Sequence, residues 1–382
     1  MLTAPDLNIE SLYLEAAELT GANPRSFVFR EGCERLLAAL DTEARLTAAN
    51  RPAARTGILN SLVVQAQLDQ LAARHAEIRE WPVVRPVVLT GLLRSGTTLL
   101  HNLLALHPGL RAPLLWELMS PAGERGDDDL HERLAVDAQS WVDGYYRIVP
   151  QLRGIHPMDA RRPDECHRLM ANTFESMIFE ARYRVPSYQD WLRTRDLVEP
   201  FRHHKRQLQT LLWRRPRSGR VLLKCPFHMW SLDALTMVYP DVTVIQLHRT
   251  PTEAIPSMCS LCYTMRTARA GQVDAHEIGR QWLDRVSGAL SGLPVQRGFV
   301  PADRLLDVRY ADLVADPVGT AASVCAFIGL PFTASVELAM RSYLDSHASE
   351  ASSAHRYSAA DFGLSVADLE RRFAAYREEF GC

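Results

Sequence analysis

The chain has 382 residues, of which 47% are hydrophobic and 23% charged, and its formal net charge is -2. A chain of this length can bury about 75% of the surface that it exposes when unfolded, so its stability requires no disulfide framework. The small net charge gives no global basic field, which argues against duplex nucleic acid as a partner. No stretch approaches the ~18 apolar residues of a membrane span, and the N-terminus is acidic where a signal peptide would be basic. We therefore expect a cytoplasmic protein without stable membrane insertion.

Residues 1–80 predict an N-terminal helical extension. Three segments with apolar residues at helical spacing begin at Asn8, Pro24 and Arg55, and the first of them ends at a glycine. The remaining residues, 81–382, are expected to form the main domain.

From Pro82 onward, short apolar strands alternate with helical segments. Strands are predicted at residues 86–90, 219–226, 241–249 and 303–310. Continuous apolar strands separated by helices favour an α/β fold with a central parallel sheet flanked by helices on both faces. Residues 113–217, between the first two strands, predict a helical insertion that forms a substrate pocket or a lid.

The first strand runs into a glycine loop within "RPVVLTGLLRSGTTLLHNLLALHP". The loop has the G-x-x-x-x-G spacing of a phosphate-binding loop, yet Thr97 stands where that motif has a lysine. Gly96 still lets the backbone approach an anion, Thr97 and Thr98 supply hydroxyls at a helix N-terminus, and Arg94 supplies a cation beside Ser95. The loop therefore predicts a site for a short anion, one phosphate carrying one further group, rather than for a triphosphate.

A second anion site is indicated where the third strand ends in "HRTPTEAIPSMCS". Arg249 leaves the strand, and Ser257 follows eight residues later in the next predicted helix. A guanidinium fork and a hydroxyl in this arrangement can converge on one phosphate.

These two motifs, about 155 residues apart, resemble those of sulfotransferases that use 3′-phosphoadenosine 5′-phosphosulfate (PAPS), most closely the bacterial branch. The resemblance runs from about Ile58 to the C-terminus, and it implies a P-loop-type three-layer fold. It also implies that the glycine loop binds the 5′-phosphosulfate, that the later arginine and serine bind the 3′-phosphate, and that the C-terminal segment closes over the nucleotide. The donor-binding residues so implied are Arg94, Ser95, Gly96, Thr97, Thr98, Arg249, Ser257 and Arg356.

Lys224 ends the second predicted strand, at the sheet edge where open α/β sheets bind ligands. Sulfuryl transfer should resemble phosphoryl transfer, with a loose in-line transition state and negative charge on the leaving oxygen. Lys224 is similar to the family lysine that stabilises this charge. The transferred group is itself weakly charged, so we expect no metal.

Two residues compete for the role of the base that takes the proton of the acceptor. His228 begins the segment after the second strand, four residues beyond the lysine, whereas cytosolic members of the family have their histidine two residues beyond it. Glu165 follows Pro163, which is expected to open a helix, and it matches an acidic position of the bacterial members. His156 and His167 are less favoured, and the choice between His228 and Glu165 stays open.

The acceptor is expected to be a small molecule with an apolar or aromatic part, sulfated on a hydroxyl or, as the less favoured option, an amine. Aromatic residues of the insertion can line its pocket or form the insertion's core. Cys259 and Cys262 form a C-x-x-C pair, for which two buried thiols are favoured over a metal or redox site. The oligomeric state stays open. The aromatic residues concerned are Trp116, Tyr145, Tyr146, Phe174, Phe179, Tyr183, Tyr188 and Trp191.

Two other functions compete with sulfuryl transfer. An ATP- and magnesium-dependent P-loop kinase or hydrolase would need a lysine where Thr97 stands and an acidic residue where the third strand ends in His248. A non-catalytic nucleotide-binding protein would have no use for Lys224 together with a candidate base.

Overall fold

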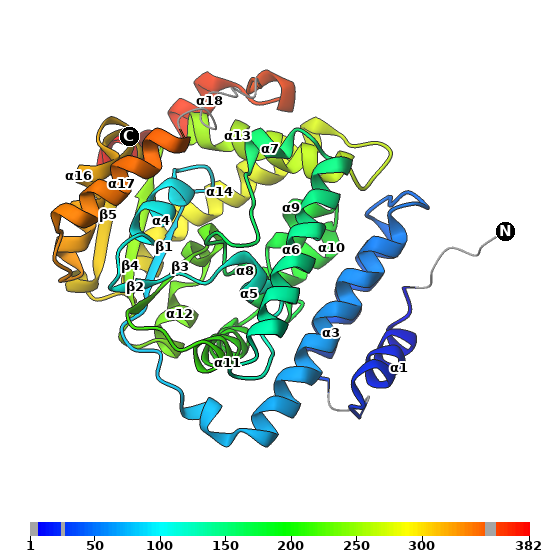
Figure 1. Ribbon diagram of the computed structural model, residues 1–382. Coiled ribbons are helices and arrows are strands. Elements are labelled where there is room, and N and C mark those ends of the chain that lie inside the picture. Colours follow the sequence, from blue (N-terminus) through cyan, green and yellow to red (C-terminus); the bar gives the residue numbers. More distant parts are fainter. Residues whose placement is uncertain (1–6, 24–26, 348–356) are drawn as a thin grey trace.

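The computed structural model describes residues 7–23, 27–347 and 357–382. Its centre is a five-stranded parallel sheet with the strand order β2-β3-β1-β4-β5 (Figure 1). Four strands lie where the sequence predicted them, and the two-residue edge strand β2 was not predicted. The strands are β1 (Val87–Gly91), β2 (Leu110–Arg111), β3 (Arg220–Lys224), β4 (Thr243–His248) and β5 (Leu305–Arg309).

Both faces of the sheet are buried, which explains why its central strands are continuously apolar. In β1, Val87 and Leu89 belong to one hydrophobic cluster, and Val88 between them belongs to another. The first cluster includes side chains from α4 (Thr97–Leu104), α15 (Tyr310–Ala315), α16 (Pro317–Phe327) and α17 (Ala334–His347). The second includes side chains from α12 (Leu232–Val238), α13 (Pro251–Thr267) and α14 (Ala275–Arg297). The predicted α/β class is confirmed.

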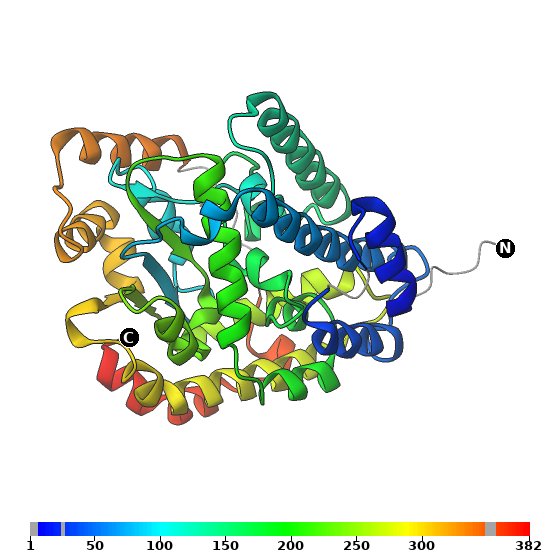
Figure 2. The same cartoon turned by 90° about the horizontal axis from the view of Figure 1, so that it is seen from below.

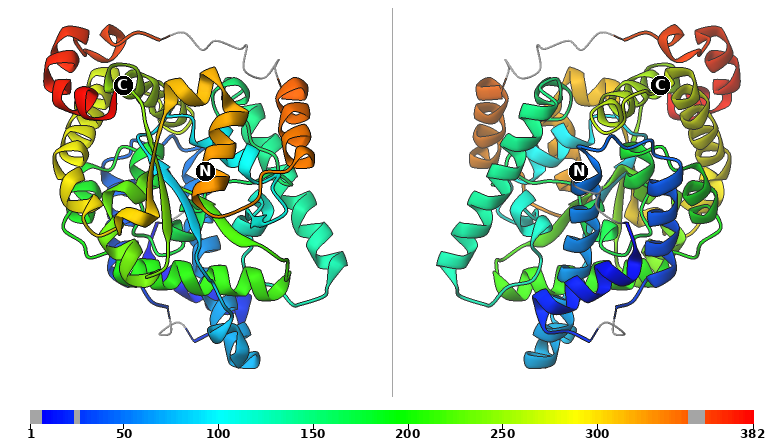
Figure 3. Two further views of the ribbon diagram at one scale, coloured as in Figure 1. Left: turned by 90° about the vertical axis from the view of Figure 1, so that its left-hand side faces the viewer. Right: turned by 90° about the vertical axis from the view of Figure 1, so that its right-hand side faces the viewer.

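The N-terminal segment forms three α-helices, on the side of the molecule away from β5 (Figures 1 and 3). The Asn8 side chain caps the first of them by accepting hydrogen bonds from two backbone N–H groups. Gly21 ends that helix in the left-handed conformation. Leu12 and Leu36 share a hydrophobic cluster with Phe174 of the insertion. The elements are α1 (Ile9–Thr20), α2 (Arg30–Thr42), α3 (Arg51–Arg74) and the 3-10 helix η2 (Ala76–Glu80).

Residues 113–217, between β2 and β3, contain seven α-helices, and their path near Pro163 differs from the prediction. Pro163 forms an isolated antiparallel bridge with Leu114 instead of opening a helix. The helix begins at His167, and the Cys166 N–H donates to the Lys224 carbonyl oxygen at 3.0 Å. The segment that carries Glu165 is therefore attached to the end of β3. The helices are α5 (Leu115–Met119), α6 (Asp128–Ile148), α7 (Leu152–Ile155), α8 (His167–Ala171), α9 (Ile178–Arg182), α10 (Pro186–Leu192) and α11 (Val198–Arg214).

The C-terminal helices run beside α13 and α14 and secure the end of β4 (Figure 2). His248 contacts the Tyr376 hydroxyl through Nδ1 at 2.8 Å and stacks on the Phe380 ring. No helix in residues 7–23, 27–347 and 357–382 combines the length and the apolar character needed to cross a bilayer. The remaining elements are η3 (Pro226–Trp230), η4 (Ala302–Arg304), η6 (Ala360–Phe362), α18 (Val366–Arg372) and α19 (Ala374–Phe380).

Candidate active site

The glycine loop is a tight turn between β1 and α4. Gly91 has φ 137°, and a Cβ there would lie 2.2 Å from the Leu247 carbonyl oxygen, so no other residue fits. Gly96 has φ 86° and precedes the first turn of α4. Between them, the Ser95 hydroxyl is buried and has no hydrogen-bond partner among the described residues. Gly96, Thr97 and Thr98, at the helix N-terminus, line the cavity over the loop, and Ser95 does not. A helix N-terminus that faces a cavity suits an anion.

Arg94, Arg249 and Ser257, predicted from two distant segments, lie together. The Arg94 Nε donates to the Ser257 hydroxyl at 3.1 Å, and the Arg249 Nη1 donates to the Arg94 carbonyl oxygen at 2.6 Å. The Arg249 guanidinium also lies over the Tyr310 ring, 4.2 Å from its centroid. Burial lowers the pKa of Arg94, and the nearby charge of Arg249 lowers it further. This concentration of positive charge favours an anionic ligand.

The remaining candidate for the donor site, Arg356, lies outside the described residues.

Lys224 lies at the carboxyl end of β3 with its side chain 2% exposed. Its Nζ donates to the Thr98 hydroxyl at 3.1 Å and to Glu165 Oε1 at 2.8 Å. One ammonium group thus joins the glycine loop to the insertion.

Glu165 is held by two neighbours. His167 Nδ1 lies 3.0 Å from Glu165 Oε2, while Lys224 contacts the other oxygen. Burial alone would raise the pKa of Glu165, but Lys224 and His167 hold it well below its usual range. Burial lowers the pKa of His167 to about 4, so its ring is neutral at pH 7. Nothing in the sequence indicated the contact between Glu165 and His167, since it depends on the loop that precedes α8.

His228 lies away from this group, in the core. Its Nε2 is 3.2 Å from the Cys166 Sγ, and its ring packs on Phe201 and His204. The cavity lining includes Phe227 but not His228. Cys166, His204 and His228 have potential ligand atoms within 4.8 Å of one another, and they are the one group of three in the described residues that could hold a metal ion. Glu165 therefore lines the cavity, whereas His228 packs in the core.

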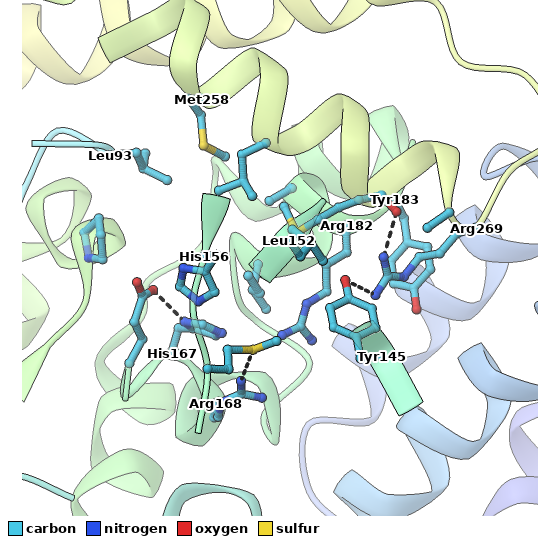
Figure 4. A pocket seen from close by; sticks show the side chains of 18 of the residues that line it. Leu93, Tyr145, Leu152, His156, His167, Arg168, Arg182, Tyr183, Met258 and Arg269 are labelled. Atoms are coloured by element: carbon cyan, nitrogen blue, oxygen red, sulfur yellow. Dashed lines mark hydrogen bonds and ion pairs between the residues drawn. The ribbon is translucent and has the colours of Figure 1, made fainter. Parts of the chain in front are cut away.

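A cavity of about 850 Å³ lies over the loop and the strand ends. We call the wall formed by Arg94, Gly96, Thr97, Thr98, Arg249 and Tyr310 the donor half. The acceptor half is the wall formed by Tyr145, Leu152, Met158, Arg168, Ile178, Arg182, Tyr183 and Arg269, part of which is shown in Figure 4. Glu165 and His167 also line the cavity.

The aromatic residues of the insertion divide between pocket and core. Tyr145 and Tyr183 line the cavity. Five others are buried in hydrophobic clusters. Trp191 is partly buried and packs against one of these clusters. The five buried residues are Trp116, Tyr146, Phe174, Phe179 and Tyr188. Cys259 and Cys262 are also buried, as expected.

Residues 86–334, which contain the loop, Glu165, Lys224 and Arg249, match the model of the sulfotransferase family. The chain belongs to this family. The resemblance inferred from the two anion-site motifs is thereby confirmed, and this sulfotransferase is an enzyme that transfers a sulfuryl group from a sulfate donor.

Three proteins similar to this sulfotransferase are mycobacterial. It is 25% identical to the omega-hydroxy-beta-dihydromenaquinone-9 sulfotransferase Stf3 of Mycobacterium bovis over 69% of this chain and 67% of the relative. The crystal structure of the sulfotransferase STF1 from Mycobacterium tuberculosis superimposes with a TM-score of 0.82 and 29% identity, covering 96% and 98% of the two chains. The crystal structure of STF9 from Mycobacterium avium superimposes with a TM-score of 0.86 and 24% identity, covering 98% of this chain and 97% of STF9. This second similarity supports the fold alone. The predicted P-loop-type fold is confirmed.

Proposed function

We propose that this sulfotransferase moves the sulfuryl group of PAPS to a hydroxyl of a small apolar acceptor. The observation that carries the proposal is the position of Lys224, whose Nζ contacts both Thr98 of the glycine loop and Glu165 of the insertion. Before the reaction, an ammonium group at this point can hold Glu165, the proposed base, in place. During the reaction it can reach the leaving oxygen of a donor bound by the loop.

The donor half fits a nucleotide with two separate anionic groups. Gly96, Thr97 and Thr98, which line the cavity at the N-terminus of α4, suit the 5′-phosphosulfate, next to Arg94. Arg249 and Ser257 would hold the 3′-phosphate, with Arg249 providing a guanidinium fork. Thr97 stands where the lysine of a P-loop would reach the γ-phosphate of ATP, and PAPS has no γ-phosphate. We assign no metal to the reaction, because charge on the leaving group can be stabilised by Lys224.

Proton transfer and leaving-group stabilisation would be coupled through Lys224 and Glu165. When Lys224 turns toward the bridging oxygen of the donor, Glu165 loses its ion pair in a buried site, and its pKa rises. Glu165 can then take the proton of the acceptor hydroxyl while the acceptor oxygen bonds to sulfur. The sulfur–oxygen bond to the nucleotide breaks, and the electron pair leaves with adenosine 3′,5′-bisphosphate next to Lys224. His167 would orient Glu165 throughout.

The acceptor half supports an acceptor with an apolar or aromatic body. Leu152, Met158, Ile178 and the rings of Tyr145 and Tyr183 line it. The relative from Mycobacterium bovis is named for a hydroxylated menaquinone, which has such a body and a hydroxyl. We place the reaction in the cytoplasm. All seven cysteines lie in the described part of the chain and none forms a disulfide, which fits a reducing compartment.

Calorimetric titration of the purified protein with adenosine 3′,5′-bisphosphate and, separately, with ATP plus magnesium tests the donor. We expect the bisphosphate to bind tightly and ATP with magnesium to bind weakly. The reverse preference would replace the proposal with a kinase or hydrolase. Transfer of radiolabelled sulfate from PAPS to a panel of hydroxylated apolar compounds then tests the reaction itself.

A further inference from the structure

The acceptor half contains an arginine, Arg182, that has no hydrogen bond or ion pair through its guanidinium in the part of the chain that the structure describes. Arg182 is the last residue of α9, and its side chain points into the cavity toward Arg168 and Tyr145 (Figure 4). Protein arginines away from open solvent normally have a partner, because an isolated cation in a low-dielectric site loses its hydration without compensation.

The other two arginines of the acceptor half are already engaged. Arg168 forms an ion pair with Asp164 at 3.0 Å. Arg269 follows the end of α13 and donates to the Tyr145 hydroxyl at 2.9 Å and to the Met265 carbonyl oxygen at 2.7 Å. Neither arginine provides an acceptor for Arg182, and both add positive charge near it. Burial and these two neighbours lower the pKa of Arg182 to about 10, at which it is still protonated at neutral pH.

The cavity offers no counter-ion. Among the described lining residues, Glu165 is the one carboxylate, and its two oxygens contact Lys224 and His167. The six lining arginines are Arg94, Arg147, Arg168, Arg182, Arg249 and Arg269. Arg182 therefore has no counter-ion among the described lining residues, and its guanidinium donors are available for a ligand.

We propose that Arg182 forms an anion subsite in the acceptor half, and that the acceptor is a hydroxylated apolar molecule carrying one carboxylate. This inference rests on the proposed sulfuryl transfer and names its substrate class. The donor nucleotide has its own cations, Arg94 and Arg249, on different elements, so Arg182 is left for the acceptor. A carboxylate matches one guanidinium in charge and in its two-oxygen geometry.

The subsite also orients the acceptor. Arg182 and Glu165 line the same cavity. The apolar side chains of Leu152 on α7 and Ile178 on α9 line it too. With its carboxylate on Arg182 and its apolar body along this wall, the acceptor would present its hydroxyl to Glu165. Arg182 is thus a positioning and specificity residue rather than a catalytic one.

The test compares 12-hydroxydodecanoate with its methyl ester, which has the same chain and hydroxyl but no charge. Calorimetry with the protein saturated with adenosine 3′,5′-bisphosphate measures the affinity for each. We expect the wild type to prefer the carboxylate by ~10- to 100-fold, as for a charge-assisted contact, and Arg182→Met to abolish that preference. Arg202→Met, which removes an exposed arginine of α11, is the matched control and should keep it.

A melting curve separates this role from a structural one. Removing a cation without a partner should leave the melting temperature of Arg182→Met unchanged or raise it, whereas a structural arginine would lower it. Equal affinity of the wild type for the two compounds, a preference that survives Arg182→Met, or a destabilised variant would overturn the proposal. These failures leave bisphosphate binding intact, whereas loss of that binding in the same titrations would remove the proposed function.

Discussion

The two halves of the cavity differ in how their charges are satisfied. In the donor half, Arg249 donates to the Arg94 carbonyl oxygen and Arg94 donates to the Ser257 hydroxyl, so the site is organised before any ligand arrives. In the acceptor half, Arg182 has no partner in the described residues, and the charges next to it are the two cations Arg168 and Arg269. Preorganised cations suit a donor that is the same in every turnover. An unsatisfied cation beside the apolar side chains of the acceptor half instead sets which acceptor can enter.

The largest effect is expected at the junction of the halves. Lys224→Ala should lower kcat by ~100-fold or more, because the leaving oxygen loses its ammonium, while the affinity for adenosine 3′,5′-bisphosphate stays within about threefold. Single-turnover assays and calorimetry measure the two quantities. The variant also leaves Glu165 without its ion pair, so the double variant Lys224→Met, Glu165→Gln is the control for folding. Near-normal turnover of Lys224→Ala would remove it from the mechanism.

Glu165→Gln should lower kcat by ~100-fold, since the amide cannot accept the proton. In the free enzyme the Glu165 pKa is depressed, so the carboxylate stays ionised until the pH falls well below 4.5. The kcat/KM for the donor should therefore show no acid limb between about pH 5 and 8, whereas a histidine base would give one near pH 6.5. His228→Asn should lower the melting temperature rather than kcat. An acid limb near 6.5 that disappears in His228→Asn would contradict this assignment.

Arg249→Ala should affect the donor half alone. The affinity for adenosine 3′,5′-bisphosphate should fall by ~10- to 150-fold, which corresponds to the ~1.5–3 kcal/mol of a charge-assisted hydrogen bond. Adenosine 5′-monophosphate, which lacks the 3′-phosphate, should bind equally to both proteins. Arg249 is paired with the exposed Glu253 at 2.9 Å, so Glu253→Gln should slightly strengthen bisphosphate binding. If both nucleotides lose affinity equally in Arg249→Ala, Arg249 does not contact the 3′-phosphate.

The sequence predicted which residues meet around the glycine loop, because the geometry there is local. A strand, a glycine loop and a helix are specified by neighbouring residues, and parallel strands bring their carboxyl ends to one edge, so Arg94, Lys224 and Arg249 had to lie near one another. The strand β2 was not predicted, because two residues are too few to show the alternation of apolar and polar residues that indicates a strand.

The acceptor half could not be predicted in the same detail, because it is built from segments whose orientation depends on tertiary packing. Tyr183 lines the cavity while Tyr188, five residues later, is fully buried, and both look alike in the sequence. His228 lies on a 3-10 turn that directs it toward Cys166 instead of the cavity. Glu165 was a candidate for its position in the sequence, but its place beside Lys224 follows from the backbone bond between Cys166 and the end of β3.

The smallest effect is expected in the acceptor half, at a contact that only orients a neighbour. Tyr145→Phe removes the hydroxyl that accepts a hydrogen bond from Arg269 and keeps the ring that lines the wall. The apparent KM for an acceptor should rise by ~2- to 5-fold, in keeping with the modest net value of one hydrogen bond, and the donor affinity should not change. Steady-state kinetics with each substrate varied in turn measure both. A change in donor affinity would mean that the two halves are coupled through α13, and the contrast between a preorganised donor site and a selective acceptor wall would no longer hold.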